Sequence, residues 1–179
     1  MIPILQQQSR SILQTEAQDN LDQWTDFKTN RRNLTSLLDT WFEAQQEANP
    51  ALYHAIATES YTFAHAGDLV TMLLFWTGKL LLHNCLFVLQ NCRDDYVALE
   101  ATLAMDREMD AADAVVGRIL KSVPWAAKPE NGIMSKLFAL PPLRYAARFC
   151  ERWDMLQRLE ECKAMDKVIT SGGCERMAG

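Results

Sequence analysis

The segment from Leu69 to Leu89 constrains this chain most, because 15 of its 21 residues are apolar. A helix that crosses a membrane needs about 20 mostly apolar residues, and this segment is long enough. However, Lys79, His83 and Asn84 interrupt it, and a lysine at the centre of a bilayer costs about 2.5–3.5 kcal/mol on insertion scales. We therefore predict that the segment is a buried core helix of a protein folded in water, with no membrane span.

The sequence also predicts helices in the rest of the chain. Hydrophobic residues make up 49% of the 179 residues, and there are only 7 glycines and 6 prolines, which is typical of a globular chain with long regular elements. No stretch alternates apolar and polar residues for long enough to predict a strand. We predict an all-α array of about six or seven helices around the central apolar helix, with a single domain over 1–170 and a flexible tail over 171–179.

Capping residues and prolines set the expected helix boundaries. Asn49 and Pro50 are typical of an N-cap and a first helical residue, and Asp94 begins a helix where a carboxylate is favourable. Prolines predict a loop over 122–132, which holds Trp125, and a break at Pro141-Pro142. The predicted helices span 11–28, 34–48, 50–57, 61–91, 94–122, 134–140 and 142–169.

Net charge and cysteine content exclude several classes of protein. A net charge of −5 and a pI near 5.2 argue against direct nucleic-acid binding, which begins with a basic surface. Five scattered cysteines with no CxxC pair predict reduced thiols in the cytoplasm rather than a disulfide framework. The three histidines and the cysteines have no metal-ligand spacing, so we expect no metal and no cofactor.

The polar residues of the apolar helix give the first candidate site. On a helix of 3.6 residues per turn they share one stripe, together with two phenylalanines: Asp68, Thr71, Phe75, Lys79, His83, Phe87 and Gln90. Such a stripe either faces solvent or lines a cavity where Lys79 and His83 meet a ligand. In the second case His83 and Lys79 are the candidate catalytic residues, since histidine exchanges protons near neutral pH. The candidate substrate-binding residues are Phe75, Trp76, Phe87, Trp125 and Tyr145.

Two further sets of charged residues fall on helix faces. Asp106, Asp110 and Asp113 share one face; they are either a solvated surface or a cation site. Four arginines share a face of the last predicted helix: Arg144, Arg148, Arg152 and Arg158. We expect them to pair with neighbouring acids such as Glu151, Asp154 and Glu160, or to contact an acidic protein partner or a second copy of the chain through Arg144, Arg148 and Arg152.

Four pieces of the chain, in order, carry a family resemblance. They are Phe63-Ala64 followed by Leu69, Trp76 and 79–82; the helix ending in 119–125 (ILKSVPW); Gly132; and Phe138 with Pro142-Leu143-Arg144 and Ala146-Ala147. From about Tyr61 to Ala164 the chain resembles the regulatory (middle homology) region of fungal zinc-cluster transcription factors. The resemblance implies an all-helical region, in agreement with the periodicity.

The chain also departs from that family. The six-cysteine zinc cluster that reads DNA in those factors does not occur before Cys85, so the resemblance does not extend to DNA binding. We expect a stand-alone relative that lacks the DNA-binding half.

Two functions compete. In the first, the chain binds a hydrophobic small molecule of fungal secondary metabolism, with a cofactor-free cyclisation (pericyclic, Diels–Alder type) or an isomerisation as its reaction, since neither needs a nucleophile or a cofactor motif. In the second, it is a non-enzymatic transcriptional regulator that acts through protein–protein contacts, with the nucleus as its compartment. A remnant with no specific ligand is a third, weaker alternative. An enclosed apolar cavity touching Lys79 and His83 would favour the first function, and an exposed apolar patch the second.

Overall fold

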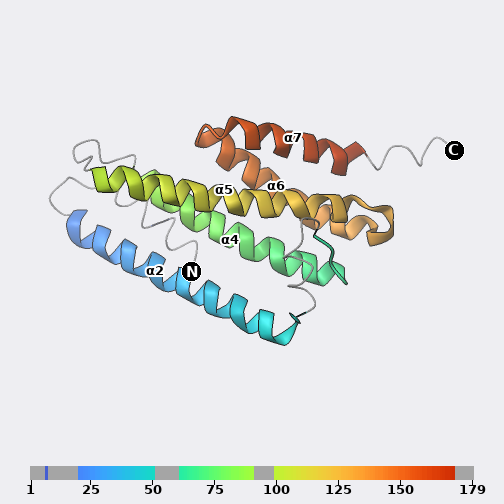
Figure 1. The fold of residues 1–179 in the computed structure, drawn as a ribbon, viewed down its shortest axis with the longest axis horizontal. Coiled ribbons are helices and arrows are strands. Elements are labelled where there is room, and N and C mark those ends of the chain that lie inside the picture. Colours follow the sequence, from blue (N-terminus) through green and yellow to red (C-terminus); the bar gives the residue numbers. More distant parts are fainter. Residues whose placement is uncertain (1–6, 8–19, 51–60, 91–98, 172–179) are drawn as a thin grey trace.

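A computed structural model describes residues 7, 20–50, 61–90 and 99–171 of the chain, and these residues form helices joined by short connections (Figure 1). The elements are α2 (Asn20–Ala48), α4 (Ala66–Gln90), α5 (Leu99–Ala127), the 3-10 turn η1 (Pro129–Asn131), α6 (Gly132–Arg152) and α7 (Leu156–Ser171). The described residues contain no strand, and the all-α prediction is confirmed.

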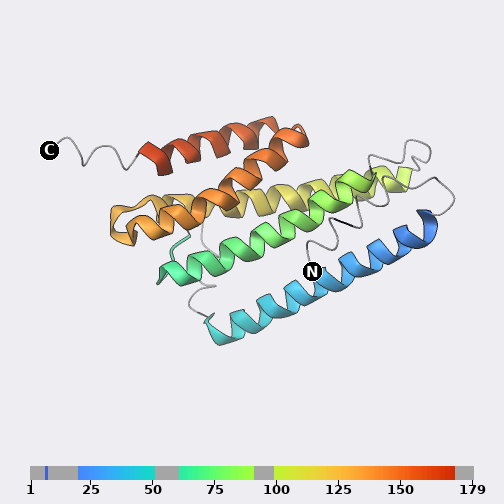
Figure 2. The ribbon, with the colours of Figure 1, turned by 180° about the vertical axis from the view of Figure 1, so that it is seen from behind.

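The apolar helix α4 packs against three other helices. It contacts α2, α5 and α6, whereas α7 packs on α5 and α6. Figures 1 and 2 show α2 and α7 at opposite edges of the array. The window Ala66–Val88 is long and apolar enough to cross a membrane, but 56% of it is buried inside the protein. This burial agrees with the prediction of a core helix rather than a membrane span.

One large core holds the helices together. Fully buried side chains of α4 such as Trp76 and Leu80 meet Val116 and Ile119 of α5 and Leu143 of α6. Because helices gain most of their stability from the burial of one apolar face, the contacts of α4 with α2, α5 and α6 stabilise this part of the fold. At the start of α4, the Asp68 carboxylate accepts a hydrogen bond from the backbone N–H of His65 at 3.2 Å. This bond is one half of a capping box.

The described residues form five α-helices, so the predicted number of six or seven is not confirmed. Residues 20–28 and 34–48 of two predicted helices belong to the single helix α2, which contains neither Gly nor Pro. Residues 11–19 of the first predicted helix lie outside the described residues. The predicted short helix 50–57 and the predicted acidic start at Asp94 lie outside the described residues, as do residues 172–179 of the expected tail.

The prediction of a loop over 122–132 is wrong for its first half. Helix α5 continues through Pro124 to Ala127, so Trp125 is helical and only 8% exposed. The Trp125 ring packs edge-on against Phe63 at a centroid distance of 5.4 Å. Burial of Val123, Trp125 and Ala126 offsets the one backbone hydrogen bond that Pro124 cannot donate.

Pro141 and Pro142 lie inside α6 and do not break it, contrary to the sequence prediction. Without their N–H groups, the carbonyls of Leu137 and Phe138 lose their helical donors. Both of these residues are about half exposed, at 51% and 44%, so water can reach that side of the helix. Pro142 itself is buried, and its packing in the core compensates for the lost hydrogen bonds.

The chain instead breaks between α6 and α7, where no Pro or Gly occurs. Asp154 adopts φ 54°, the left-handed conformation, and the Met155 N–H donates to the Cys150 carbonyl at 2.9 Å. This six-to-one bond is the Schellman arrangement, in which a residue with positive φ ends a helix; Asp tolerates that conformation better than most residues do. The break separates Arg158, on α7, from the other three arginines, on α6.

Two neighbouring leucines of α4 allow a matched test of the core. Leu73 is 1% exposed and Leu74 is 66% exposed. We expect Leu73→Ala to lower the free energy of unfolding by about 2–5 kcal/mol through lost burial and a cavity, and Leu74→Ala to change it by less than about 0.5 kcal/mol. Urea unfolding followed by circular dichroism measures both. Equal losses in the two variants would contradict the packing of α4.

Candidate functional site between helices α2, α4 and α5

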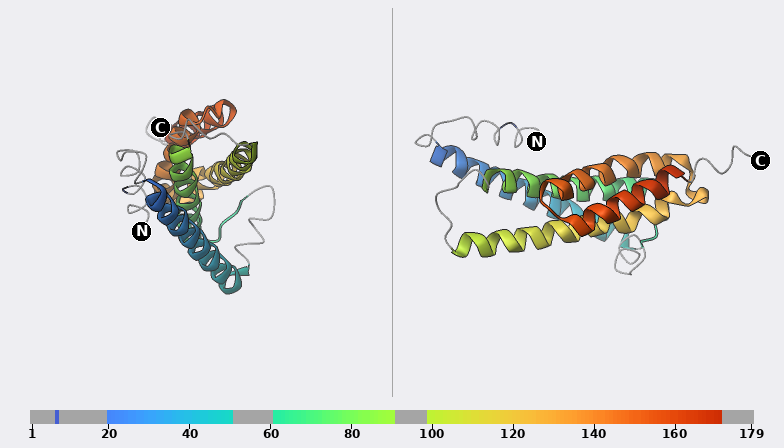
Figure 3. Two further views of the ribbon diagram at one scale, coloured as in Figure 1. Left: turned by 90° about the vertical axis from the view of Figure 1, so that its left-hand side faces the viewer. Right: turned by 90° about the horizontal axis from the view of Figure 1, so that it is seen from above.

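A groove lies where α2 crosses the surface of α4 and α5. Phe27 of α2 is fully buried against Leu82, Cys85 and Leu86 of α4, and this small second core fixes α2 on α4. Figure 3 shows the ribbon of α2 beside that of α4. Beside it lies an open groove of about 990 Å³. Its lining residues are Lys28, Arg31, Arg32, Thr35, Ser36, Asp39, Thr40, Glu43, Lys79, Leu82, His83, Leu86, Arg107, Glu108 and Ala111.

The structure brings the two candidate catalytic residues, Lys79 and His83, into this one groove. They stand one helical turn apart on α4, on the polar stripe that the sequence indicates. At this point the stripe faces α2 and α5, because Lys79 pairs with Asp39 of α2 and His83 with Glu108 of α5.

Glu108 of α5 joins His83 to α2. Its carboxylate lies 2.8 Å from His83 Nδ1 and accepts a hydrogen bond from Arg31 Nη2 at 2.7 Å. The hydrogen bond from His83, opposed by burial and supported by the Arg31 charge, lowers the pKa of Glu108 to about 2 from its ordinary 4.5. The arrangement holds the imidazole in one orientation, as a carboxylate does for a general base.

Lys79 has a partner of its own. Its ammonium forms an ion pair with Asp39 of α2 and lies 5.8 Å from the centroid of the Phe75 ring. Phe75 is buried and stacks on Phe42 of α2 at 4.4 Å. The two predicted residues Lys79 and Phe75 are therefore neighbours, and both help to fix α2 against α4.

Phe87 and Trp76 are fully buried core residues. Phe87 lies behind His83, with 6.4 Å between the ring centroids, and also packs on Phe149 and Trp153. Trp76 stacks on Tyr61 at 5.6 Å. Neither residue lines the groove. Trp125 packs on Phe63 elsewhere in the core. The structure therefore does not place Trp76, Phe87 and Trp125 in the groove with Lys79 and His83.

Tyr145 lines a different pocket, on α6, together with Leu137, Leu140, Pro141, Arg144 and Arg148. Its hydroxyl is buried and makes no hydrogen bond within the described part of the chain. Burial, reinforced by the nearby Cys85 thiol and opposed by the Arg152 charge, raises the pKa of Tyr145 to about 12. Asn84 already accepts the Trp153 indole N–H at 3.1 Å.

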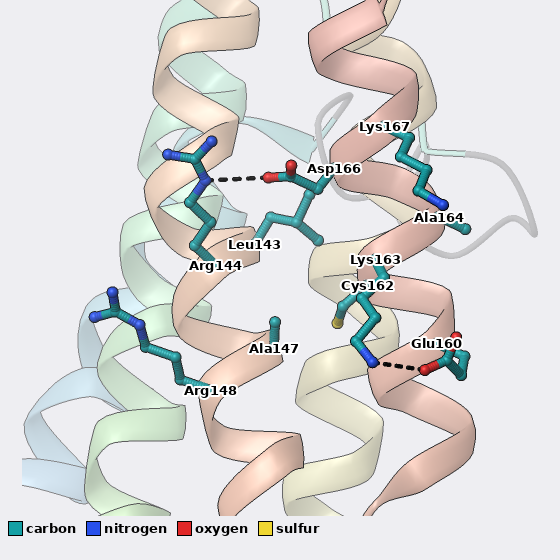
Figure 4. Close-up of a pocket in the computed structure, with 10 residues that line it drawn as sticks. All are labelled: Leu143, Arg144, Ala147, Arg148, Glu160, Cys162, Lys163, Ala164, Asp166 and Lys167. Atoms are coloured by element: carbon teal, nitrogen blue, oxygen red, sulfur yellow. Dashed lines mark hydrogen bonds and ion pairs between the residues drawn. The ribbon is translucent and has the colours of Figure 1, made fainter.

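A second groove, of about 680 Å³, lies between α6 and α7 (Figure 4). Its apolar floor includes Leu143, Ala147 and Cys162, and its rim is charged. Figure 4 shows Arg144 turned toward Asp166 of α7, with a hydrogen bond of 3.1 Å from Nε, while the Arg148 side chain extends away from α7.

The prediction that the arginines pair with Glu151, Asp154 and Glu160 is wrong for Arg144, which pairs with Asp166, and for Arg158. Arg158 donates to both carboxylate oxygens of Asp113, at 2.7 and 2.8 Å, and to Glu161. Hydrogen bonds from Arg158 lower the pKa of Asp113. Of the three aspartates on one face of α5, Asp113 therefore holds α7, whereas Asp106 and Asp110 are exposed. The described residues include no group of three or more His, Cys, Asp or Glu side chains placed to hold a metal ion.

The residues that sequence reasoning missed are Arg31, Asp39 and Glu108. Each is a charged residue on a helix other than α4, and no spacing along the chain marks it as a partner of Lys79 or His83. One physical argument points to such partners: a lysine and a histidine on a buried apolar helix require partners, and α2 and α5 both carry charged residues.

Comparisons with protein-family models, with curated proteins and with solved structures gave no match to this chain.

The low pKa of Glu108 predicts a specific dependence of stability on pH. A carboxyl group whose pKa is lower in the folded state stabilises the fold above its unfolded pKa. The contribution is therefore complete above about pH 4.5 and is lost as the pH falls toward 2. We expect Glu108→Gln to be less stable than the parent by about 1–2 kcal/mol at pH 7 and to lose less stability on acidification.

Urea unfolding at pH 7, 4 and 3 measures this difference. Asp106→Asn, at an exposed position of the same helix, is the matched control and should keep the parent's pH dependence. Parallel pH profiles for Glu108→Gln and the parent would show that Glu108 is not held by His83 and Arg31.

Proposed function

We propose that this chain is a non-enzymatic regulatory module that binds an acidic, amphipathic protein segment on the outer face of α6. The observation that carries the proposal is an exposed apolar surface that continues into exposed arginines. We call this the α6 surface; it consists of Ile133, Met134, Leu137, Phe138, Arg144 and Arg148. The proposal agrees with the resemblance to the regulatory region of zinc-cluster factors and implies a nuclear location.

The apolar half of the α6 surface is unusually exposed. Ile133 is 71% exposed, Met134 52%, Leu137 51% and Phe138 44%. On a helix these positions lie side by side across two turns, so they form one patch rather than scattered residues. Contiguous apolar patches of this kind mark sites of interaction with other proteins.

The basic half of the surface lies on the same helix face. Arg144 is 60% exposed although it pairs with Asp166, and Arg148 is exposed. Leu137, Arg144 and Arg148 also line the shallow pocket beside Tyr145, so the apolar and basic halves meet there. A partner helix with apolar residues at spacings of three and four and with acidic residues toward one end complements both halves.

Binding of a designed peptide tests the proposal. We expect a fluorescent, acidic amphipathic helical peptide to bind the full chain with micromolar affinity in an anisotropy titration, and a peptide of the same composition without helical periodicity to bind at least tenfold more weakly. Phe138→Ser and Arg148→Glu should each weaken binding about tenfold or more, since each removes one half of the surface.

Leu156→Ser is the matched control, because Leu156 is 68% exposed but lies on α7, outside the α6 surface. It should leave the affinity unchanged. Equal binding of the two peptides, or equal effects of the control and the α6 variants, would overturn the proposal.

A hydrophobic-metabolite protein is the second candidate function, with a cofactor-free cyclisation or isomerisation as its reaction. It is favoured by one observation, the presence of Lys79 and of a Glu108-oriented His83 in a single groove. A hydrogen bond from either residue would polarise a substrate carbonyl. The charged lining of the groove is less suited to a hydrophobic substrate than an enclosed apolar cavity would be.

Turnover assays test this second function. If it holds, incubation of the chain with polyene carbonyl substrates should yield cyclised or isomerised product with one dominant handedness, detected by chiral chromatography and mass spectrometry. His83→Ala should lower kcat by at least tenfold, and Lys79→Met should lower kcat or raise KM. Racemic product at the uncatalysed rate would contradict this function and leave the α6 proposal unaffected.

A further inference from the structure

We propose that the α2–α4–α5 groove holds a phosphate-bearing small molecule, whose phosphate is bound by Arg31, Arg32 and Arg107. This inference is independent of the α6 surface, which lies on another helix.

The first observation is a local excess of positive charge. Five cationic side chains line the groove: Lys28, Arg31, Arg32, Lys79 and Arg107. Only three carboxylates do so, those of Asp39, Glu43 and Glu108. The whole chain has a net charge of −5, so this groove is opposite in sign to the rest of the protein. A positively lined cleft concentrates anions.

The second observation is a buried donor that has no acceptor among the residues the structure describes. Arg31 uses Nη2 to bind Glu108, but its Nε–H is buried and has no hydrogen-bond partner within the described residues. Buried donors in folded proteins almost always have a partner, and an unsatisfied one costs about 1–3 kcal/mol. An oxygen of a bound anion would supply the missing acceptor.

The third observation is a pair of guanidinium groups that are not engaged by other described side chains. Arg32 of α2 and Arg107 of α5 are exposed, and among the described residues neither forms an ion pair. They approach the groove from two different helices. Guanidinium groups bind phosphate oxygens in pairs of parallel hydrogen bonds, and a phosphate monoester carries nearly two negative charges, which suits two such groups.

The remaining lining suggests a molecule larger than inorganic phosphate. A groove of about 990 Å³ is within the range of small-molecule sites, which is about 300–1,000 Å³. Ser36 and Thr40 offer hydroxyls to polar groups, and Leu82, Leu86 and Ala111 offer apolar surface. A phosphate ester with a hydroxylated or partly apolar body fits these groups.

Calorimetric titration of the full chain with inorganic pyrophosphate tests the site. Citrate serves as a polycarboxylate of similar charge, and all titrations are matched for ionic strength with NaCl. We expect saturable pyrophosphate binding with a Kd below about 1 mM, at least tenfold tighter than citrate, and a rise in Tm on addition of pyrophosphate.

Two variants and one control locate the binding. Arg32→Gln and Arg107→Gln are at exposed positions and should fold normally, and each should weaken pyrophosphate binding about tenfold. Arg118→Gln changes an exposed arginine of α5 outside the groove and should leave the affinity unchanged. Equal affinity for citrate, equal losses in all three variants, or no heat beyond that of NaCl would each overturn the assignment.

Discussion

Burial of the α4 side chains is the interaction on which the rest of the structure depends. Trp76, Leu80 and their neighbours can leave water only if other helices cover α4 on several sides, and α5, α6 and α2 do so. The same burial creates a problem for Lys79 and His83, because a charged or strongly polar group on a buried helix needs a partner. Asp39 from α2 and Glu108 from α5 supply those partners.

Because these partners are charged, α2 is held against α4 and α5 partly by ion pairs as well as by apolar packing. Its small apolar core around Phe27 lies next to ion pairs that remain partly open to water. A charged groove results where α2, α4 and α5 meet, whereas the outer face of α6 exposes apolar side chains. These two surfaces motivate two separate proposals, an anion site in the charged groove and a protein contact on the apolar and basic face of α6.

Prolines show how tertiary packing overrides local preference. Pro124 and the pair Pro141-Pro142 lie inside helices, although each removes a backbone hydrogen bond. Each proline site adjoins buried core side chains, such as Trp125 and Leu143, so continuing the helix gains more from packing than it loses in hydrogen bonding. The break after Arg152 depends on the left-handed conformation of Asp154, a residue type that carries a weak turn signal in sequence.

Hydrophobic periodicity by itself determined that this chain is all-α, that 69–89 forms a core helix, and that Lys79 and His83 share one face of it, because those properties depend on residues close together in sequence. Only the tertiary structure decided which charges meet them. Arg31 and Glu108 are 77 residues apart, and Lys79 and Asp39 are 40 apart, so their pairing follows from how the helices cross. The same reason explains why Trp76 and Phe87 lie in the core. A helix face is buried where neighbouring helices cover it, and it can form a site only where they leave it open.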